Sequence, residues 1–275
     1  MRGTLGDERA RQEAQLRQEM VRVGQLLHLR GYVAATDGNM TVRLGDDRLL
    51  VTPSGMSKGF MQTEQMILTD LEGRPLDTAN SAAARPSAEL RLHLEAYRQR
   101  PDIRAVVHAH PPLCTALTVA GLSLEACVIP EVIMTLGTIP TVPYATPTTA
   151  EGPEQARQWL RTRDALLLDR HGTLTLGQTL FEAYLKLEKI EHTAQIIITA
   201  HQLGRVTTLT PEQMAKLIAI RKEHGWSREG DEAAFRRAMA NGVQAEATRF
   251  SADEAETLAR LIGRLMVGQI EKGSA

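Results

Sequence analysis

Residues 106–111 read Val-Val-His-Ala-His-Pro, an apolar stretch that ends in two histidines and a proline. Side chains two apart in a β-strand point to the same face, so His108 and His110 would present two imidazoles together. Pro111 ends the strand because it has no N–H to donate. Taken alone, such a pair is more often two strand histidines with ordinary hydrogen bonds. The segment therefore predicts a strand end that carries either a metal-binding pair or two structural histidines.

A third histidine, His171, stands in a turn between two apolar stretches, 165–169 and 173–176, that read as strands. A turn histidine can reach a neighbouring strand end, although turns are normally polar and need no function. Three imidazoles with an open fourth position are typical of a reactive zinc site. Imidazole also accommodates other first-row metals such as manganese or cobalt. Such an ion would polarise a carbonyl group and stabilise an enolate-like intermediate.

Glu89 is the candidate acid–base, at the start of a helix that Ser87 can cap and that is expected to run to Tyr97. A glutamate in the first turn is also favoured by the helix dipole without any catalytic role. To exchange protons near neutral pH, the carboxyl group would need a pKa raised by partial burial.

The pattern around these residues is α/β, and the chain then changes to helices only beyond a composition shift at 204–210. We therefore divide it into a catalytic domain, 1–205, and a helical C-terminal extension, 206–275. Helical spacing is seen over 7–29, 87–97, 113–119, 148–161, 180–203, 211–224, 231–240 and 252–270. Strands are expected over 40–44, 48–52, 66–71, 104–110, 165–169 and 173–176, with short extended pieces near 128 and over 139–143.

Composition narrows the class of protein. The 32 basic and 33 acidic residues leave no basic field, so no nucleic-acid partner is expected. Cys114 and Cys127 form no CxxC motif, which suits a reducing compartment. The charged N-terminus has no apolar core, and no apolar run approaches the ~20 residues of a membrane span. We expect a cytoplasmic protein with a small-molecule substrate and no membrane partner.

Together these segments resemble the class II aldolase/adducin family, whose motifs occur here in the family's order over roughly residues 10–205. The resemblance implies a three-layer α/β/α fold around a central, largely antiparallel sheet, and a homo-oligomer, commonly a tetramer with sites at subunit interfaces. The matching motifs are Gly38-Asn39-Met40-Thr41-Val42-Arg43, Thr52-Pro53-Ser54-Gly55, Pro86-Ser87-Ala88-Glu89, His108-Ala109-His110-Pro111, Val142-Pro143-Tyr144-Ala145 and His171-Gly172.

The resemblance also implies a role for each site residue. His108, His110 and His171 match the family's zinc ligands, and Glu89 matches the acid–base. The reaction would be cleavage of a carbon–carbon bond in a small hydroxy-carbonyl compound, through a metal-stabilised enediolate. Glycine lets backbone amides approach an anion, and Asn and Ser add donors, although the same residues suit ordinary turns. The residues that match the family's phosphate-holding loops are Gly38, Asn39, Ser54, Gly55 and Ser87.

Two departures from the family pattern leave the reaction open. Ala88 replaces the second of two serines found in the sugar-phosphate aldolases, and Ile129 falls where the fuculose-phosphate aldolases have a proton-donating tyrosine. Glu131 either faces the site or forms a surface salt bridge. The alternatives are a decarboxylase of a small carboxylated hydroxy or oxo acid, an epimerase or a dehydratase on the same metal site. A non-enzymatic adducin-like interaction module is disfavoured because all three histidines and Glu89 are present.

Overall fold

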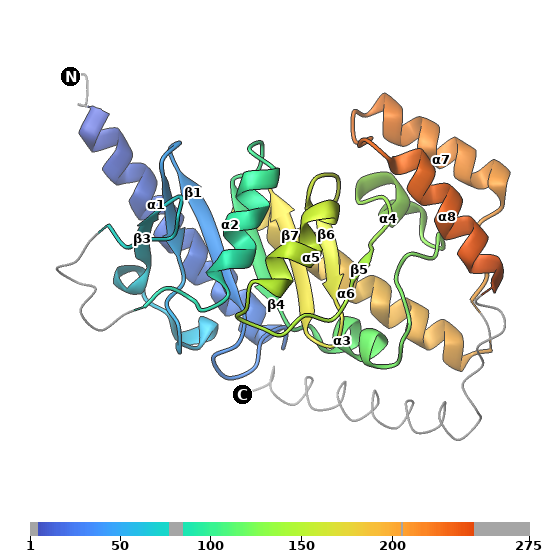
Figure 1. Ribbon diagram of the computed structural model, residues 1–275, viewed down its shortest axis with the longest axis horizontal. Coiled ribbons are helices and arrows are strands. Elements are labelled where there is room, and N and C mark those ends of the chain that lie inside the picture. Colours follow the sequence, from blue (N-terminus) through green and yellow to red (C-terminus); the bar gives the residue numbers. More distant parts are fainter. Residues whose placement is uncertain (1–4, 77–84, 205, 245–275) are drawn as a thin grey trace.

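The computed structural model describes residues 5–76, 85–204 and 206–244, and the helix predicted over 252–270 lies outside them. Its centre is a seven-stranded sheet in the order β3-β2-β1-β4-β7-β6-β5, antiparallel except for the β5–β6 pair (Figure 1). The strands are β1 (Asn39–Leu44), β2 (Arg48–Val51), β3 (Ile67–Asp70), β4 (Ala105–Ala109), β5 (Thr141–Val142), β6 (Ala165–Leu168) and β7 (Gly172–Gly177).

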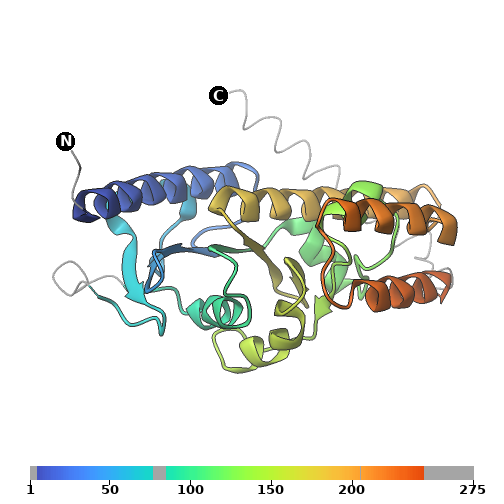
Figure 2. The ribbon, with the colours of Figure 1, turned by 90° about the horizontal axis from the view of Figure 1, so that it is seen from above.

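Helices cover both faces of this sheet (Figure 2). Helices α1 (Leu5–Leu29), α3 (Pro112–Val119) and α6 (Leu180–Gln202) share one apolar core with one face, and α2 (Leu90–Gln99) and α5 (Glu151–Leu160) share another core with the opposite face. In β4, Val107 belongs to the first core and Val106 to the second, which is why this strand is apolar throughout. The predicted three-layer α/β/α fold is confirmed.

Four short or shifted helices differ from the sequence-based expectation. Pro130 begins a helix, α4 (Pro130–Thr135), between the two expected extended pieces, where no element was predicted, because six residues are too few to reveal helical spacing. Helix α5 starts at Glu151 rather than near Thr148, whose positive φ of 67° interrupts the helix. Two 3₁₀ helices, η1 (Lys58–Phe60) and η2 (Thr63–Gln65), connect β2 to β3.

The predicted C-terminal helices are present as α7 (Pro211–Glu223) and α8 (Asp231–Gln244). Thr210 and Gln213 form a capping box that starts α7. Both helices contribute to a small apolar cluster with Cys127 and Ile133, beside α4. The boundary placed at residue 205 remains a prediction. Within the described residues, no helix is both long and apolar enough to cross a membrane.

Candidate active site

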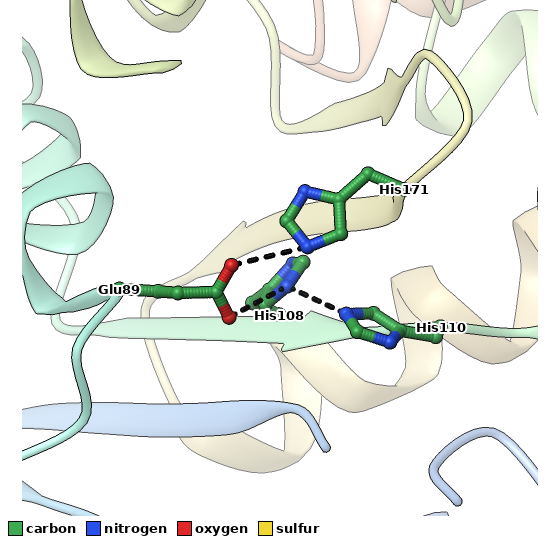
Figure 3. Close-up of side chains that lie close together, drawn as sticks. All are labelled: Glu89, His108, His110 and His171. Carbon is green, nitrogen blue, oxygen red and sulfur yellow. Dashed lines mark hydrogen bonds and ion pairs between the residues drawn. The ribbon is translucent and has the colours of Figure 1, made fainter. Parts of the chain in front are cut away.

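Four side chains converge beside the end of β4 (Figure 3). His108 lies in β4 and His110 directly after it, while His171 occupies the turn between β6 and β7 and Glu89 precedes α2. One nitrogen or oxygen atom from each side chain lies within 4.8 Å of those from the other three. They meet because β7 is the neighbour of β4, so the turn before β7 adjoins the last residues of β4.

The Glu89 carboxylate bridges two of the imidazoles. Its Oε2 atom lies 3.2 Å from Nε2 of His108, and its Oε1 atom lies 3.0 Å from Nε2 of His171. The third imidazole is as close, since Nε2 of His110 lies 3.0 Å from Nε2 of His108. The three ring centroids are 4.8–4.9 Å apart, so the rings surround one small space.

A backbone carbonyl group orients the buried His108 ring through the nitrogen that faces away from the cluster. Its Nδ1 atom lies 2.8 Å from the backbone carbonyl oxygen of Thr173, which can only accept a hydrogen bond. The ring proton is therefore assigned to Nδ1, and the lone pair of Nε2 faces the cluster. Metal-binding histidines are usually held by such a bond to a carbonyl or carboxylate. Three imidazole nitrogens and a carboxylate around one space fit a divalent cation.

Glu89 stands one residue before α2, as its N-cap, rather than in the first helical turn as expected. Burial alone would raise the pKa of its carboxyl group, but hydrogen bonds and charges from His108 and His171 outweigh burial and lower it when these imidazoles are protonated. The expected upward shift is therefore absent while the imidazoles carry those protons. Burial, followed by the charges of His108 and His171, lowers the pKa of His110 to about 4, which favours the neutral, ligand-type imidazole.

Asn39, the first residue of β1, and Asp37, just before β1, complete the surroundings of the histidine–glutamate cluster. Asn39 Nδ2 donates a hydrogen bond of 3.1 Å to Glu89 Oε2, and Asp37 Oδ2 lies 3.5 Å from Nδ1 of His110. Asn39 pairs with His108 across β1 and β4, which brings this loop to the cluster. Asp37 was not predicted as a site residue, and its only signal in the sequence is its place beside Gly38-Asn39. Among the described residues, the buried Asn39 Oδ1 has no hydrogen-bond partner.

Two of the residues predicted to hold a phosphate, Ser87 and Ser54, contact Glu89 or the segment before it. The Glu89 backbone N–H donates to Ser87 Oγ over 3.3 Å, and the Ser54 backbone N–H donates to the carbonyl of Arg85 over 2.8 Å. The loop with Ser54 and Gly55 therefore runs beside the segment before Glu89. Gly38 has a φ of 71°, and a Cβ atom there would lie 3.0 Å from the His108 carbonyl oxygen. Only glycine allows this close approach.

A small pocket, partly open to solvent, is lined by Glu89 and His171. Ala88 lines it, where the family pattern has a serine, together with Arg91 and Thr146. Glu131 is exposed on α4 and Tyr144 is 53% exposed. Of the residues that the structure describes, neither Glu131 nor Tyr144 lines this pocket.

Comparison with known proteins identifies the family. Residues 18–198 match the family described as Class II Aldolase and Adducin N-terminal domain. The chain belongs to this family. An L-fuculose phosphate aldolase from Methanococcus maripaludis is 34% identical to this class II aldolase family member over 178 residues, covering 65% of this chain and 93% of the relative.

Two further relatives show the range of activities in the class II aldolase family. A 3-oxo-tetronate 4-phosphate decarboxylase from Pectobacterium atrosepticum is 33% identical over 211 residues, covering 74% of this chain and 93% of the relative. The solved structure of an L-fuculose-1-phosphate aldolase from Thermus thermophilus is 31% identical with a TM-score of 0.61, covering 71% and 100% of the two chains. The names of these relatives indicate an enzyme, either an aldolase or a decarboxylase.

Proposed function

We propose that this class II aldolase family member is a divalent-metal-dependent lyase that cleaves a carbon–carbon bond in a small hydroxy-carbonyl substrate. The observation that carries the proposal is the convergence of three imidazoles and one carboxylate at the end of β4. His108, His110 and His171 would hold the ion, with zinc as the first choice and manganese or cobalt as alternatives. When bound, the ion supplies Lewis acidity that stabilises negative charge on the substrate oxygens.

Glu89 is the proposed proton carrier. In a retro-aldol cleavage, the hydroxyl on the departing carbon loses its proton, the carbon–carbon bond breaks, and the carbon next to the retained carbonyl gains a proton. The Glu89 carboxylate lies against two imidazoles and accepts a hydrogen bond from Asn39, which fixes its orientation. It is therefore placed to accept the hydroxyl proton and then deliver it to that carbon of a substrate held at the histidines.

The substrate's anionic end is assigned to what we call the anion cradle, formed by Gly38, Asn39, Ser54, Gly55 and Ser87. Ser54 and Gly55 are exposed, and a Cβ atom at Gly55 would have no neighbour within 4 Å, so the backbone there is open to a ligand. The unpartnered, buried Asn39 Oδ1 is an acceptor that a substrate hydroxyl could use. These features support a phosphorylated substrate, which both named types of relative act on by their printed names.

Decarboxylation is the second candidate. Loss of carbon dioxide from a 3-oxo acid also leaves negative charge next to a carbonyl, so the same residues serve. Ala88 favours this alternative because it removes one hydroxyl that the sugar-phosphate aldolases carry, and it lines the pocket beside Glu89. A relative that is 33% identical is named as a decarboxylase of a phosphorylated 3-oxo acid.

The experiment begins with metal content by mass spectrometry on the full-length protein, followed by two substrates. Cleavage of L-fuculose 1-phosphate would be followed through dihydroxyacetone phosphate, and decarboxylation of 3-oxo-tetronate 4-phosphate through carbon dioxide. We expect about one zinc, manganese or cobalt ion per chain, as one such cluster implies. A chain that neither carries nor takes up metal would contradict the lyase proposal and favour an adducin-like interaction module.

Two further expectations belong to this proposal. The resemblance predicts a homotetramer, which sedimentation of the purified protein tests directly. It also predicts a cytoplasmic enzyme, which fractionation of the producing cells tests. A monomer that is fully active would remove the expectation that the site lies between subunits.

A further inference from the structure

One lysine outside the cluster is buried between two loops of the anion cradle. Lys58, in η1, is 1% exposed. Its Nζ atom donates to the backbone carbonyl of Thr36 over 2.8 Å and to that of Met56 over 2.6 Å. Thr36 precedes Gly38 by two residues, and Met56 directly follows Gly55. One ammonium group therefore joins the loop 36–39 to the loop 53–57.

The backbone of Lys58 is fixed by α1. A Cβ atom at Gly24 in α1 would overlap the carbonyl oxygen of Lys58, and a Cβ atom at Gly59 would lie 2.5–2.7 Å from the His28 side chain. Both glycines are needed for this close packing of α1 against η1. Because α1 fixes the backbone of Lys58, the lysine side chain extends from a fixed position to the carbonyl groups of Thr36 and Met56.

No carboxylate of residues 5–76, 85–204 or 206–244 forms an ion pair with the Lys58 ammonium group. The partly buried Lys186, by contrast, lies 3.0 Å from the carboxylate of Asp164. Burial lowers the pKa of Lys58 to about 8, although the charges of Asp37 and Glu89 oppose this. A buried ammonium without a carboxylate costs free energy that an apolar side chain would avoid. The stability of the fold therefore does not by itself account for a cation at this position.

We propose that Lys58 is a positioning residue of the anion cradle: it holds the loops 36–39 and 53–57 together and places a buried positive charge behind them. The ligand class that follows is a dianion, such as the phosphate end of the substrate. Fixed donors and a fixed charge need little reorganisation when the anion binds, which increases affinity. This inference rests on the proposed function, since it assumes that the anion cradle receives substrate.

The test is calorimetric titration of inorganic phosphate into full-length, metal-loaded protein at pH 7. Lys58→Met should weaken phosphate binding at least about tenfold, the loss expected when a charged hydrogen-bonding group is removed. Lys189→Met is the matched control, because Lys189 is partly buried on α6 and donates to Thr135 Oγ1. It should bind phosphate as the wild type does. Titration of a His108→Ala/His110→Ala variant separates binding at the cradle from binding at the metal.

A second variant and a second anion keep the test decisive. Lys58→Gln retains a donor without the charge, and it should bind phosphate more weakly than the wild type if Lys58→Met does not fold. In the Lys58 variants, the affinity for formate, a monoanion, should fall less than the affinity for phosphate. A merely structural role of Lys58 would not produce this difference. Wild-type phosphate affinity in either folded variant would overturn the proposal, as would a wild type that binds no phosphate. Metal content of the same samples tests the proposed function separately.

Discussion

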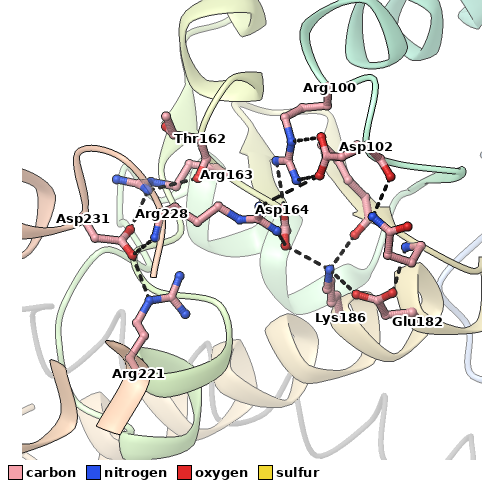
Figure 4. Close-up of polar contacts among 12 residues, drawn as sticks. Arg100, Asp102, Thr162, Arg163, Asp164, Glu182, Lys186, Arg221, Arg228 and Asp231 are labelled. Atoms are coloured by element: carbon pink, nitrogen blue, oxygen red, sulfur yellow. Dashed lines mark hydrogen bonds and ion pairs between the residues drawn. The ribbon is translucent and has the colours of Figure 1, made fainter. Parts of the chain in front are cut away.

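Two polar clusters of this protein differ in the groups that surround their carboxylates. In the first, one carboxylate, Glu89, lies among three imidazoles, and two imidazole nitrogens are 3.0 Å apart. In the second, every carboxylate lies against guanidinium or ammonium groups (Figure 4). Asp231 accepts hydrogen bonds of 2.8 Å from both Arg163 and Arg221.

Asp164, the other centre of this ion network, shows the same compensation. It accepts hydrogen bonds of 2.9 Å from Arg100, 3.0 Å from Lys186 and 2.8 Å from Arg228. Burial would raise the pKa of the Asp164 carboxyl group, but the charges of Lys186, Arg228 and Arg100 outweigh burial and lower the pKa to about 2. In this network Asp164 and Asp231 are each paired with two or more cationic groups, whereas the cluster at Glu89 is rich in lone pairs. A self-compensated cluster holds structure together, and a lone-pair-rich one suits a cation.

The ion network joins the C-terminal helices to the region before β6. Arg221 belongs to α7 and Asp231 begins α8, while Arg163 and Asp164 immediately precede β6. The ion pairs therefore attach the C-terminal helices to the sheet. The difference between the clusters predicts that changes at the histidines alter metal binding and activity, and that changes in the network alter stability.

The largest expected effect is removal of two imidazoles. A His108→Ala/His110→Ala double variant should lose its metal and its activity to the detection limit, because one imidazole cannot hold the ion in place. Metal content by mass spectrometry measures this. The matched control is His192→Ala/His224→Ala, which removes two exposed histidines and should leave metal content unchanged. Metal retained in the first variant would contradict the site.

Next is the proposed proton carrier. Glu89→Gln should lower kcat by about 10²–10⁴-fold, the usual contribution of a general acid–base. Because three imidazoles remain, metal content should stay near that of the wild type. Glu131→Gln is the control, since Glu131 is exposed and carries the same side chain. Loss of metal in Glu89→Gln would instead make Glu89 a ligand, and unchanged kcat would exclude its role.

Within the ion network, Asp231→Ala leaves two buried guanidinium groups, Arg163 and Arg221, without their carboxylate. Removing one partner of a buried ion pair should lower the free energy of unfolding by about 3–5 kcal/mol. Urea unfolding measures this, and metal content should not change. Glu72→Ala, which removes an exposed partner of Arg74, is the control and should cost at most about 1 kcal/mol. Equal stability of both variants would refute a structural role for the network.

The smallest effect depends on pH. The pKa of Asp164 is lowered from the ordinary 3.8 to about 2, so its carboxylate stabilises the fold above the ordinary value and loses that contribution as pH falls toward 2. Asp164→Asn mimics the protonated group. The variant should be about 2 kcal/mol less stable near pH 6, and the two proteins should converge between pH 4 and 2. A difference in free energy of unfolding that does not depend on pH would contradict this assignment.

Local signals in the sequence predicted much of the fold and the candidate site. The alternation in residues 106–111 and the turn around His171 each depend on a few neighbours, and the structure brings the three histidines together as the resemblance implied. The long helices followed from apolar spacing. Helix α4 was missed because it has too few turns to show a period.

Contacts between segments far apart in sequence could not be predicted. Asp37 adjoins His110 only because β1 pairs with β4, and a register is not visible in one strand alone. The lowered pKa of Glu89 likewise depends on His108 and His171, which folding brings beside it. Arg163 and Asp231 are buried against each other although 68 residues separate them in the sequence, and nothing local to either residue signals this contact.

The position of β4 in the middle of the sheet has a consequence for how the cluster exchanges its contents. His108 is paired on both sides, with Asn39 of β1 and Leu174 of β7, so its strand is among the last parts of the fold to open. His171 and Glu89 lie in a turn and before a helix, which open at much lower cost. If the cluster holds an ion, as proposed, local opening of the turn and of the segment before the helix would release or admit it while the His108 imidazole stays in place.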